Sequence, residues 1–259
     1  MCLVLLANRS LPHTGILLAG NRDEFKSRPS APPEVISTNP VIHAGRDLEA
    51  GGTWMGRNEW GLTAALTNRR SGSLPEGEPL SRGGIITGLL GHESAENAAD
   101  WLASQPIRQY RPFNVLFGSL SAFYYFASED TPQPVLLEPG FYALSNSFLD
   151  DQSWPKVSRC HHFFQANRSL PGEKLLENLT WFLGDSTPPD QKPWTDLSEE
   201  IHGALGAVFI RNTTYGTVSS TIITLGGTLG DRYYFAEGEA LGRDPGNAFR
   251  QMPFQFRTG

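Results

Sequence analysis

The chain opens with two short apolar runs separated by a segment rich in turn-forming residues, and this pattern restricts its fold. The runs cover residues 3–7 and 16–19, and residues 8–15 between them contain Asn, Ser, Pro and Gly. Apolar runs of this length, bounded by turn formers, are typical of buried β-strands rather than of helices. The sequence therefore predicts an N-terminal β-hairpin with a rather long loop.

Strand-like runs recur along the rest of the chain. They cover residues 53–56, 62–67, 114–118, 122–127, 141–145, 207–212, 217–225 and 232–236. Residues 226–231 read GGTLGD, which predicts a hairpin turn between the last two strands. Residues 26–52 hold several prolines and glycines with little periodicity, and we expect them to form a loop.

Four segments have helical patterns: residues 81–91, 94–104, 155–166 and 172–183. Ser94 is a candidate N-cap, and Pro155 suits the first turn of a helix. Strands, helices, strands, a helix pair and strands follow one another. This order predicts an α+β fold of antiparallel sheets covered by helices. With no repeat and no long linker, we expect a single domain over residues 1–259.

Composition excludes several classes of protein. The chain has 259 residues, of which 39% are hydrophobic, and its formal net charge is −6. That hydrophobic content is too high for a disordered chain, and the acidic balance argues against a nucleic-acid binder. No run approaches the roughly 18 apolar residues that a transmembrane helix needs. The two cysteines form neither a disulfide framework nor a metal-binding spacing, so we expect a reducing compartment, the cytoplasm.

Cys2 is the first candidate for chemistry. Removal of Met1 ahead of this small residue would leave a cysteine with a free α-amine. The α-amino pKa is about 7.7–8.0, so a substantial fraction of the amine is neutral near pH 7 and can accept the thiol proton. The alternative is that Cys2 is a packing residue.

The charged tetrad Asn21-Arg22-Asp23-Glu24 comes directly after the second apolar run. A hairpin would bring the tetrad back towards Cys2. Asp23 could orient the α-amine, and Arg22 could bind a carboxylate or keep the surroundings of the thiol electropositive. The alternative is a solvated strand end with local ion pairs.

Two asparagines follow predicted strands. Asn68 comes after residues 62–67, and Asn146 comes after residues 141–145. An amide N–H aimed at a developing oxyanion stabilises its charge, although Asn at a strand end is also ordinary turn chemistry. The hydroxyl residues of the 215–221 segment could line a site, but they are also simply β-compatible residues, which is the favoured interpretation.

Together these residues resemble the NRDE family, also called the transport and Golgi organisation protein 2 family. The matching motifs are Met1-Cys2, Asn21-Arg22-Asp23-Glu24, Gly51-Gly52-Thr53-Trp54-Met55-Gly56, Trp60-Gly61-Leu62, Thr67-Asn68, Leu144-Ser145-Asn146-Ser147, Trp154-Pro155-Lys156, Tyr215-Gly216-Thr217 and Ser219-Ser220-Thr221. They span nearly the whole chain in the order of the family.

The resemblance implies an N-terminal-nucleophile hydrolase fold, a four-layer αββα sandwich, in the branch that contains bile-salt hydrolases and penicillin V acylases. It implies Cys2 as nucleophile, Asp23 on its amine, and Asn68 and Asn146 assisting the nucleophile and the oxyanion. The expected activity is hydrolysis of an acyl amide or thioester. The candidate substrate contacts in these motifs are Asn21, Arg22, Glu24 and Trp54. Val218 departs from the family, since many members have Arg there.

The resemblance also leaves a second hypothesis open. Family members are associated with haem trafficking and with lipid or acyl-coenzyme A homeostasis, so the chain could carry haem or an acyl or lipid ligand without catalysis. Catalysis itself would need no cofactor. Cys160 and His161 fall on a helical stripe with Val157 and Phe164, which favours packing over haem ligation, and His43 lies in the predicted loop where it could edge a pocket. No histidine has metal-site spacing, and no pattern indicates an oligomeric state.

Overall fold

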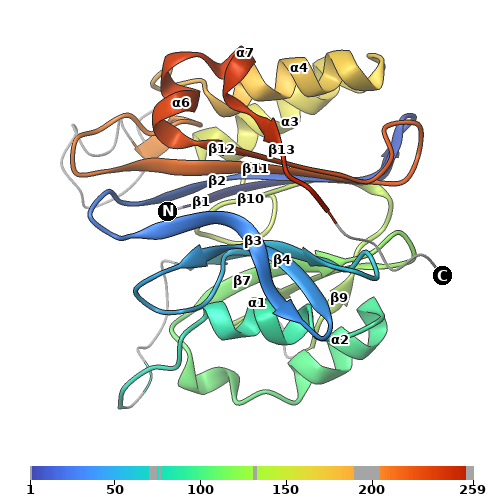
Figure 1. Cartoon of the computed structure of the whole chain (residues 1–259), viewed down its shortest axis with the longest axis vertical. Coiled ribbons are helices and arrows are strands. Elements are labelled where there is room, and N and C mark those ends of the chain that lie inside the picture. Colours follow the sequence, from blue (N-terminus) through green and yellow to red (C-terminus); the bar gives the residue numbers. More distant parts are fainter. Residues whose placement is uncertain (1, 70–74, 76, 131–132, 190–204, 255–259) are drawn as a thin grey trace. The chain divides into compact units, whose positions relative to one another are not determined.

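The computed structural model describes residues 2–69, 75, 77–130, 133–189 and 205–254, and the chain divides into two compact units (Figure 1). The first unit contains Met1–Ser27 and Gly140–Met252, and the second contains Arg28–Pro139 and Pro253–Gly259. Each unit has one antiparallel sheet with helices packed against it. Among the described residues, no helix is long and apolar enough to cross a membrane.

The sheet of the first unit contains the predicted N-terminal hairpin. Its strand order is β10-β1-β2-β11-β12-β13, in which the strands are β1 (Cys2–Leu11), β2 (Thr14–Phe25), β10 (Gly140–Leu144), β11 (Tyr215–Leu225), β12 (Arg232–Glu237) and β13 (Arg250–Gln251). The predicted turn at residues 226–231 joins β11 to β12, which pair antiparallel. The prediction placed the charged tetrad beyond the second strand, but β2 continues through it to Phe25.

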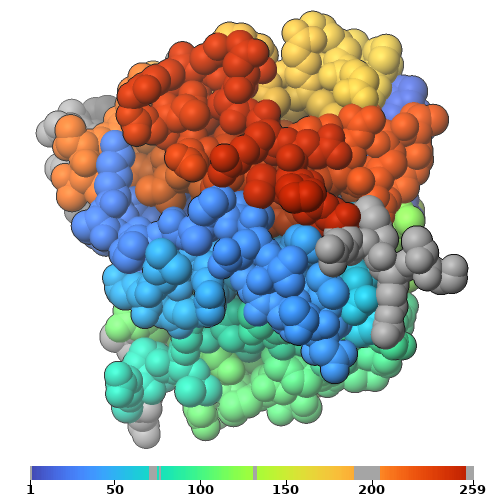
Figure 2. Space-filling model, viewed as in Figure 1, coloured from blue at the N-terminus to red at the C-terminus, as the bar shows by residue number. Residues whose placement is uncertain are grey.

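The helices of the first unit are α3 (Pro155–Asn167), α4 (Gly172–Leu183), α6 (Gly238–Arg243) and α7 (Pro245–Ala248). Helix α3 contacts β1 and β10, and α4 contacts β2 and α7. Figure 2 shows the surface of the C-terminal segments, in red, adjoining that of α4, in yellow. The core between sheet and helices contains Leu3, Leu5, Leu17, Ala19, Val157, Cys160, Phe164, Leu175 and Leu179.

The predicted stripe on α3 was right for Val157, Cys160 and Phe164 but wrong for His161. The His161 side chain remains 27% exposed, and its Nε2 lies 2.8 Å from Asp150 Oδ1. Phe163 is 8% exposed and joins the core instead. A histidine at the edge of an apolar stripe can keep its polar atoms near water while its ring covers apolar neighbours.

The second unit has the sheet order β3-β4-β5-β6-β7-β8-β9. The strands are β3 (Ser30–Thr38), β4 (Val41–Asp47), β5 (Met55–Asn58), β6 (Thr63–Asn68), β7 (Phe113–Gly118), β8 (Phe123–Ala127) and β9 (Val135–Leu136). Helix α1 (Gly83–Leu89) contacts β6, and α2 (Ala95–Ala103) contacts β8. A short 3-10 helix covers Ile107–Gln109. Ser94 caps α2 as predicted, because its side chain accepts from Asn97 N.

Two sequence predictions about strands were wrong. Residues 26–52 contain β3 and β4 instead of a loop, and β3 tolerates Pro32 and Pro33 because it is an edge strand whose pairing shifts register twice. Residues 207–210 are apolar, but the strand predicted over residues 207–212 does not form. Their amides bond elsewhere, since Phe209 N donates to Asp185 O and Ile210 N donates to Thr217 Oγ1.

Two glycines of α1 offer a matched test of packing in the second unit. A Cβ at Gly88 would lie 2.0 Å from a ring carbon of Trp101, whereas a Cβ at Gly84 would have no neighbour within 4 Å. We expect Gly84→Ala to stabilise the protein by up to about 1 kcal/mol through helix propensity. Gly88→Ala should destabilise it by about 1–3 kcal/mol through overpacking. Urea unfolding measures both, and equal effects of the two variants would contradict the predicted contact.

Candidate functional site

Cys2 begins β1 and lies at one end of a row of residues across the sheet of the first unit. It pairs with Arg22 of β2, and Arg22 pairs with Ser219 of β11. Directly paired residues of antiparallel strands place their side chains on the same face. Cys2 is half-buried, whereas Arg22 is only 5% exposed. The Arg22 side chain therefore shares a face of the sheet with the thiol, and the role predicted for it stays a prediction.

Ser219, the third member of this row, was not recognised from the sequence. Its Oγ is buried and has no hydrogen-bond partner among the residues that the structure describes. A buried hydroxyl without a protein partner is unusual, because most buried polar atoms are hydrogen-bonded. The hydroxyl-rich segment was interpreted mainly as β-compatible, and neither that interpretation nor a site-lining role distinguishes Ser219 from its neighbours.

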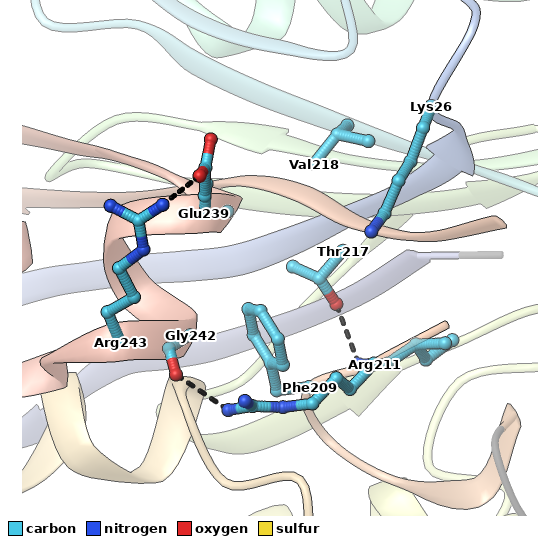
Figure 3. Close-up of a pocket in the computed structure, with 10 residues that line it drawn as sticks. Lys26, Phe209, Arg211, Thr217, Val218, Glu239, Gly242 and Arg243 are labelled. Carbon is cyan, nitrogen blue, oxygen red and sulfur yellow. Dashed lines mark hydrogen bonds and ion pairs between the residues drawn. The ribbon is translucent and has the colours of Figure 1, made fainter. Parts of the chain in front are cut away.

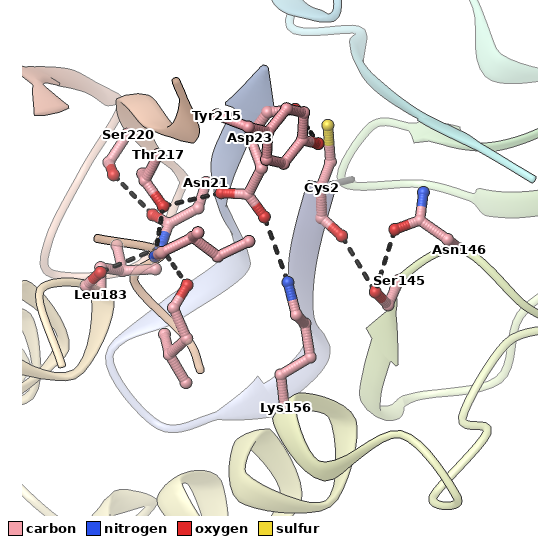
Figure 4. A network of polar contacts seen from close by, with 12 residues as sticks. Cys2, Asn21, Asp23, Ser145, Asn146, Lys156, Leu183, Tyr215, Thr217 and Ser220 are labelled. Atoms are coloured by element: carbon pink, nitrogen blue, oxygen red, sulfur yellow. Dashed lines mark hydrogen bonds and ion pairs between the residues drawn. The ribbon is translucent and has the colours of Figure 1, made fainter. Parts of the chain in front are cut away.

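Asp23 follows Arg22 in β2, so its side chain lies on the opposite, helix-covered face of the sheet. Lys156 Nζ lies 3.1 Å from Asp23 Oδ2, and both side chains are 0% exposed. Thr217 Oγ1 donates to Asp23 Oδ1 at 2.7 Å, and Tyr215 Oη donates to the Asp23 carbonyl at 2.8 Å (Figure 4). Each carboxylate oxygen of Asp23 therefore has its own partner, one on α3 and the other on β11.

Lys156 was quoted from the sequence only as part of a family motif. It is the second residue of α3 and lies four residues before Cys160, on the core-facing side of the helix. A lysine on an apolar helix stripe requires a buried acidic partner, since an unpaired buried ammonium is very costly. That pattern signals a buried ion pair, but it does not tell which carboxylate supplies the partner.

Asn21 contributes to the same buried layer. Its Nδ2 donates to Leu183 O at 2.9 Å and to Val208 O at 2.8 Å, and its Oδ1 accepts from Ser220 Oγ. Both amide hydrogens are thus used by the protein, and they join β2 to the end of α4 and to the segment before β11. The substrate contact expected of Asn21 stays a prediction, while the structure assigns it a positioning role.

Asn146 lies two residues after the end of β10, the strand that pairs with β1. It is 2% exposed. The neighbouring Ser145 Oγ donates to Cys2 O at 3.1 Å and lies 3.4 Å from Asn146 Oδ1. Figure 4 shows Ser145 between Cys2 and Asn146. The first unit therefore brings Cys2, Arg22, Asp23 and Asn146 to one end of its sheet.

The other predicted site residues are placed as follows. Glu24 is partly exposed near the end of β2, and its Oε1 accepts from Phe25 N at 2.8 Å. Asn68 ends β6 in the second unit. Trp54, just before β5, lies against Gly45, where a Cβ would come within 2.5 Å of its ring. The roles predicted for these three residues stay predictions.

The candidate haem ligands have structural environments of their own. Cys160 is 0% exposed in the core, and burial raises the pKa of its thiol. His43 lies in β4 rather than in a loop and packs on Phe254 at 4.3 Å between ring centroids. Burial, with a smaller effect from Arg57, lowers the pKa of His43. Within the described residues, no group of three or more His, Cys, Asp or Glu side chains could hold a metal ion.

Sequence comparison relates most of the chain to one family. The sequence model of Transport and Golgi organisation 2 matches residues 1–237. The Transport and Golgi organization protein 2 homolog of Homo sapiens is 31% identical over 225 residues, which cover 80% of this chain and 81% of the human protein. The homolog of Mus musculus is 30% identical over 227 residues, with the same shares of the two chains.

Solved structures share the fold at low sequence identity. The Caenorhabditis elegans N-acylethanolamine-hydrolyzing acid amidase ortholog matches with a TM-score of 0.52 and 9% identity, covering 97% of this chain and 100% of that chain. The R18L variant of conjugated bile acid hydrolase from Clostridium perfringens also has a TM-score of 0.52, with 14% identity over 97% of this chain and 92% of that chain. The fold is thus of the N-terminal-nucleophile hydrolase type, as predicted.

The buried ion pair can be tested by a double-mutant cycle. Lys156→Met should destabilise the protein by about 3–5 kcal/mol, because it leaves the Asp23 carboxylate buried without its cation. Adding Asp23→Asn should recover part of that loss, since the Asn side chain is neutral and keeps an oxygen for Thr217. Urea unfolding of the two single variants and the double variant measures the coupling. Additive losses would contradict a direct ion pair.

Proposed function

The chain belongs to the Transport and Golgi organisation 2 family, and on that premise we propose that it is an N-terminal cysteine hydrolase of an acyl amide or thioester. The observation that carries the proposal is the pairing of Cys2 with the buried Arg22, directly beside the anchored Asp23. A partly exposed thiol with a cation next to it is the environment in which a thiolate is stabilised.

The proposed reaction starts once Met1 has been removed. The free α-amine of Cys2 accepts the thiol proton, and Sγ attacks the carbonyl carbon of the substrate. Collapse of the tetrahedral intermediate transfers the proton to the leaving amine or thiol and leaves an acyl thioester on Cys2. Water then attacks this thioester with the α-amine as general base, which releases the carboxylic acid and restores the thiol.

Several residues would support this chemistry from fixed positions. Arg22 would stabilise the thiolate, and Asp23 would orient the α-amine and stabilise its ammonium form. The hydrogen bond from Ser145 to the Cys2 carbonyl, together with the contacts of Lys156 and Thr217 on Asp23, supports a preorganised geometry.

We assign the oxyanion contacts to the two asparagines. Asn146 lies next to Ser145, which bonds Cys2, so its amide belongs to the same end of the sheet. Asn68 is assigned by the family resemblance alone. An oxyanion donor of this kind contributes about 2.7–4 kcal/mol of transition-state stabilisation.

Acyl transfer to Cys2 provides the first test. We expect protein lacking Met1 to release p-nitroaniline from an N-acyl p-nitroanilide, or a thiol from an S-acyl thioester, and mass spectrometry to find the acyl group on Cys2. Cys2→Ala should lower the rate by about a thousandfold or more, because it removes the nucleophile. Cys160→Ala is the matched control and should leave the rate unchanged, since that thiol is buried in the core.

One outcome would favour a carrier instead of an enzyme. In that outcome, Cys2→Ala protein binds haem or an acyl ligand as tightly as the unmodified chain does, and neither protein turns over an acyl substrate. This result would contradict the proposed hydrolysis.

Thiol labelling provides a second, independent test. Iodoacetamide should modify Cys2 in the folded protein faster than it modifies free cysteine at pH 7, and it should reach Cys160 only in urea. Arg22→Gln and Asp23→Asn should both slow the labelling of Cys2. Protein that retains Met1 is the control for the α-amine. Labelling of Cys2 at the rate of a free thiol, with or without Met1, would show that the site does not activate it.

A further inference from the structure

A cavity of about 480 Å³ lies in the first unit, between the end of β2, the segment before β11, and α6 (Figure 3). Its volume falls within the range of small-molecule sites. Cys2 does not line it. The residues that matter for its chemistry are Lys26, Phe209, Arg211, Val218, Glu239 and Arg243.

The charge of this cavity is opposite to that of the whole chain. The formal net charge of the protein is −6, but the charged residues of the described part of the chain that line the cavity are three cations and one carboxylate. Glu239 pairs with Arg243 on the same helix. Within the described part of the chain, the Lys26 ammonium has neither a hydrogen-bond nor an ion-pair partner. The cavity thus has an excess of positive charge, which favours an anionic ligand.

The two unpaired cations are held by the surrounding backbone. Lys26 N donates to Thr214 O at 2.9 Å, which fixes the chain where β2 ends. Arg211 Nη2 donates to Gly242 O at 2.6 Å, and its Cζ lies 5.8 Å from the centroid of the Phe209 ring. Guanidinium has five N–H donors, so the contact with Gly242 orients the group and leaves further donors for a ligand.

An irregularity of the sheet supplies the apolar part of the cavity. The pairing of β11 with β2 shifts register between Thr217 and Ser219, so Val218 has no partner in β2. A bulged residue leaves the regular alternation of faces, and Val218 lines the cavity together with the Phe209 ring. Figure 3 shows Lys26 and Arg243 at opposite sides of this apolar centre.

We propose that this cavity binds an organic anion, with a carboxylate or phosphate group between Lys26 and Arg211 and an apolar body against Phe209 and Val218. The inference is independent of hydrolysis at Cys2, since it rests only on the lining of the cavity. The bidentate geometry of guanidinium suits either acidic group. Because the cations are exposed, salt should weaken the binding.

Titration calorimetry of the full chain tests this proposal with phenylacetate, phenyl phosphate and the neutral phenylacetamide. We expect saturable 1:1 binding of at least one anion, and the two anions show which acidic group is preferred. Phenylacetamide should bind at least about tenfold more weakly than the preferred anion, since it lacks the charge.

Single-charge variants then locate the site. Lys26→Gln and Arg211→Gln should each weaken anion binding about threefold to tenfold. Glu239→Gln, which removes the only carboxylate among the described residues of the lining, should strengthen it. Arg108→Gln changes the net charge equally at an exposed position of the second unit, and it should leave the affinity unchanged. Thermal unfolding confirms that each variant is folded.

Four results would overturn the proposal. The first is equal affinity for phenylacetamide and the anions. The second is an anion affinity unaffected by both Lys26→Gln and Arg211→Gln, or equally reduced by Arg108→Gln. The third is that neither anion shows saturable binding at ligand concentrations up to about 10 mM, which would mean a Kd weaker than the millimolar range. Loss of anion binding in Cys2→Ala protein would indicate a site at Cys2 instead.

Discussion

The ion pair between Lys156 and Asp23 is the interaction on which the rest of the site depends. It joins α3 to β2 in the strand next to Cys2, and both side chains are completely buried. Desolvation of two charges offsets much of their attraction, so an apolar pair of the same size would stabilise the fold about as well. What the ion pair adds is a defined position for one carboxylate, which Thr217 also holds from β11.

Two consecutive residues of β2 serve opposite faces of one sheet. Arg22 shares a face with Cys2 and Ser219, while Asp23 and Asn21 point towards the helices. The strand alternation therefore separates a cation beside the thiol from a carboxylate anchored in the core. A charged tetrad that looks like a solvated strand end in the sequence is in fact largely buried, and the fold supplies distant partners for Asn21 and Asp23.

Local pattern explains which parts of the fold were predictable. The N-terminal hairpin, the capped α2 and the amphipathic α4 follow from short-range periodicity and capping chemistry. The edge strand β3 was missed because its prolines indicate a loop unless an edge position is known. Residues 207–212 were predicted to form a strand because a short apolar run looks the same in a buried strand and in a buried irregular segment. The structure shows the difference, since backbone amides of this segment donate to Asp185 O and to Thr217 Oγ1 rather than to a neighbouring strand.

The sequence by itself determined the position of Cys2 behind Met1, the return of the tetrad towards Cys2 through a hairpin, and the family. These depend on neighbouring residues or on a hairpin of about twenty residues, within which pairing follows from the turn. Only the tertiary structure decided that Lys156 binds Asp23, that Ser145 binds the Cys2 carbonyl, and that Lys26 and Arg211 line one cavity. Those contacts join residues more than 100 positions apart, and no local pattern encodes which distant partner a buried polar group will meet.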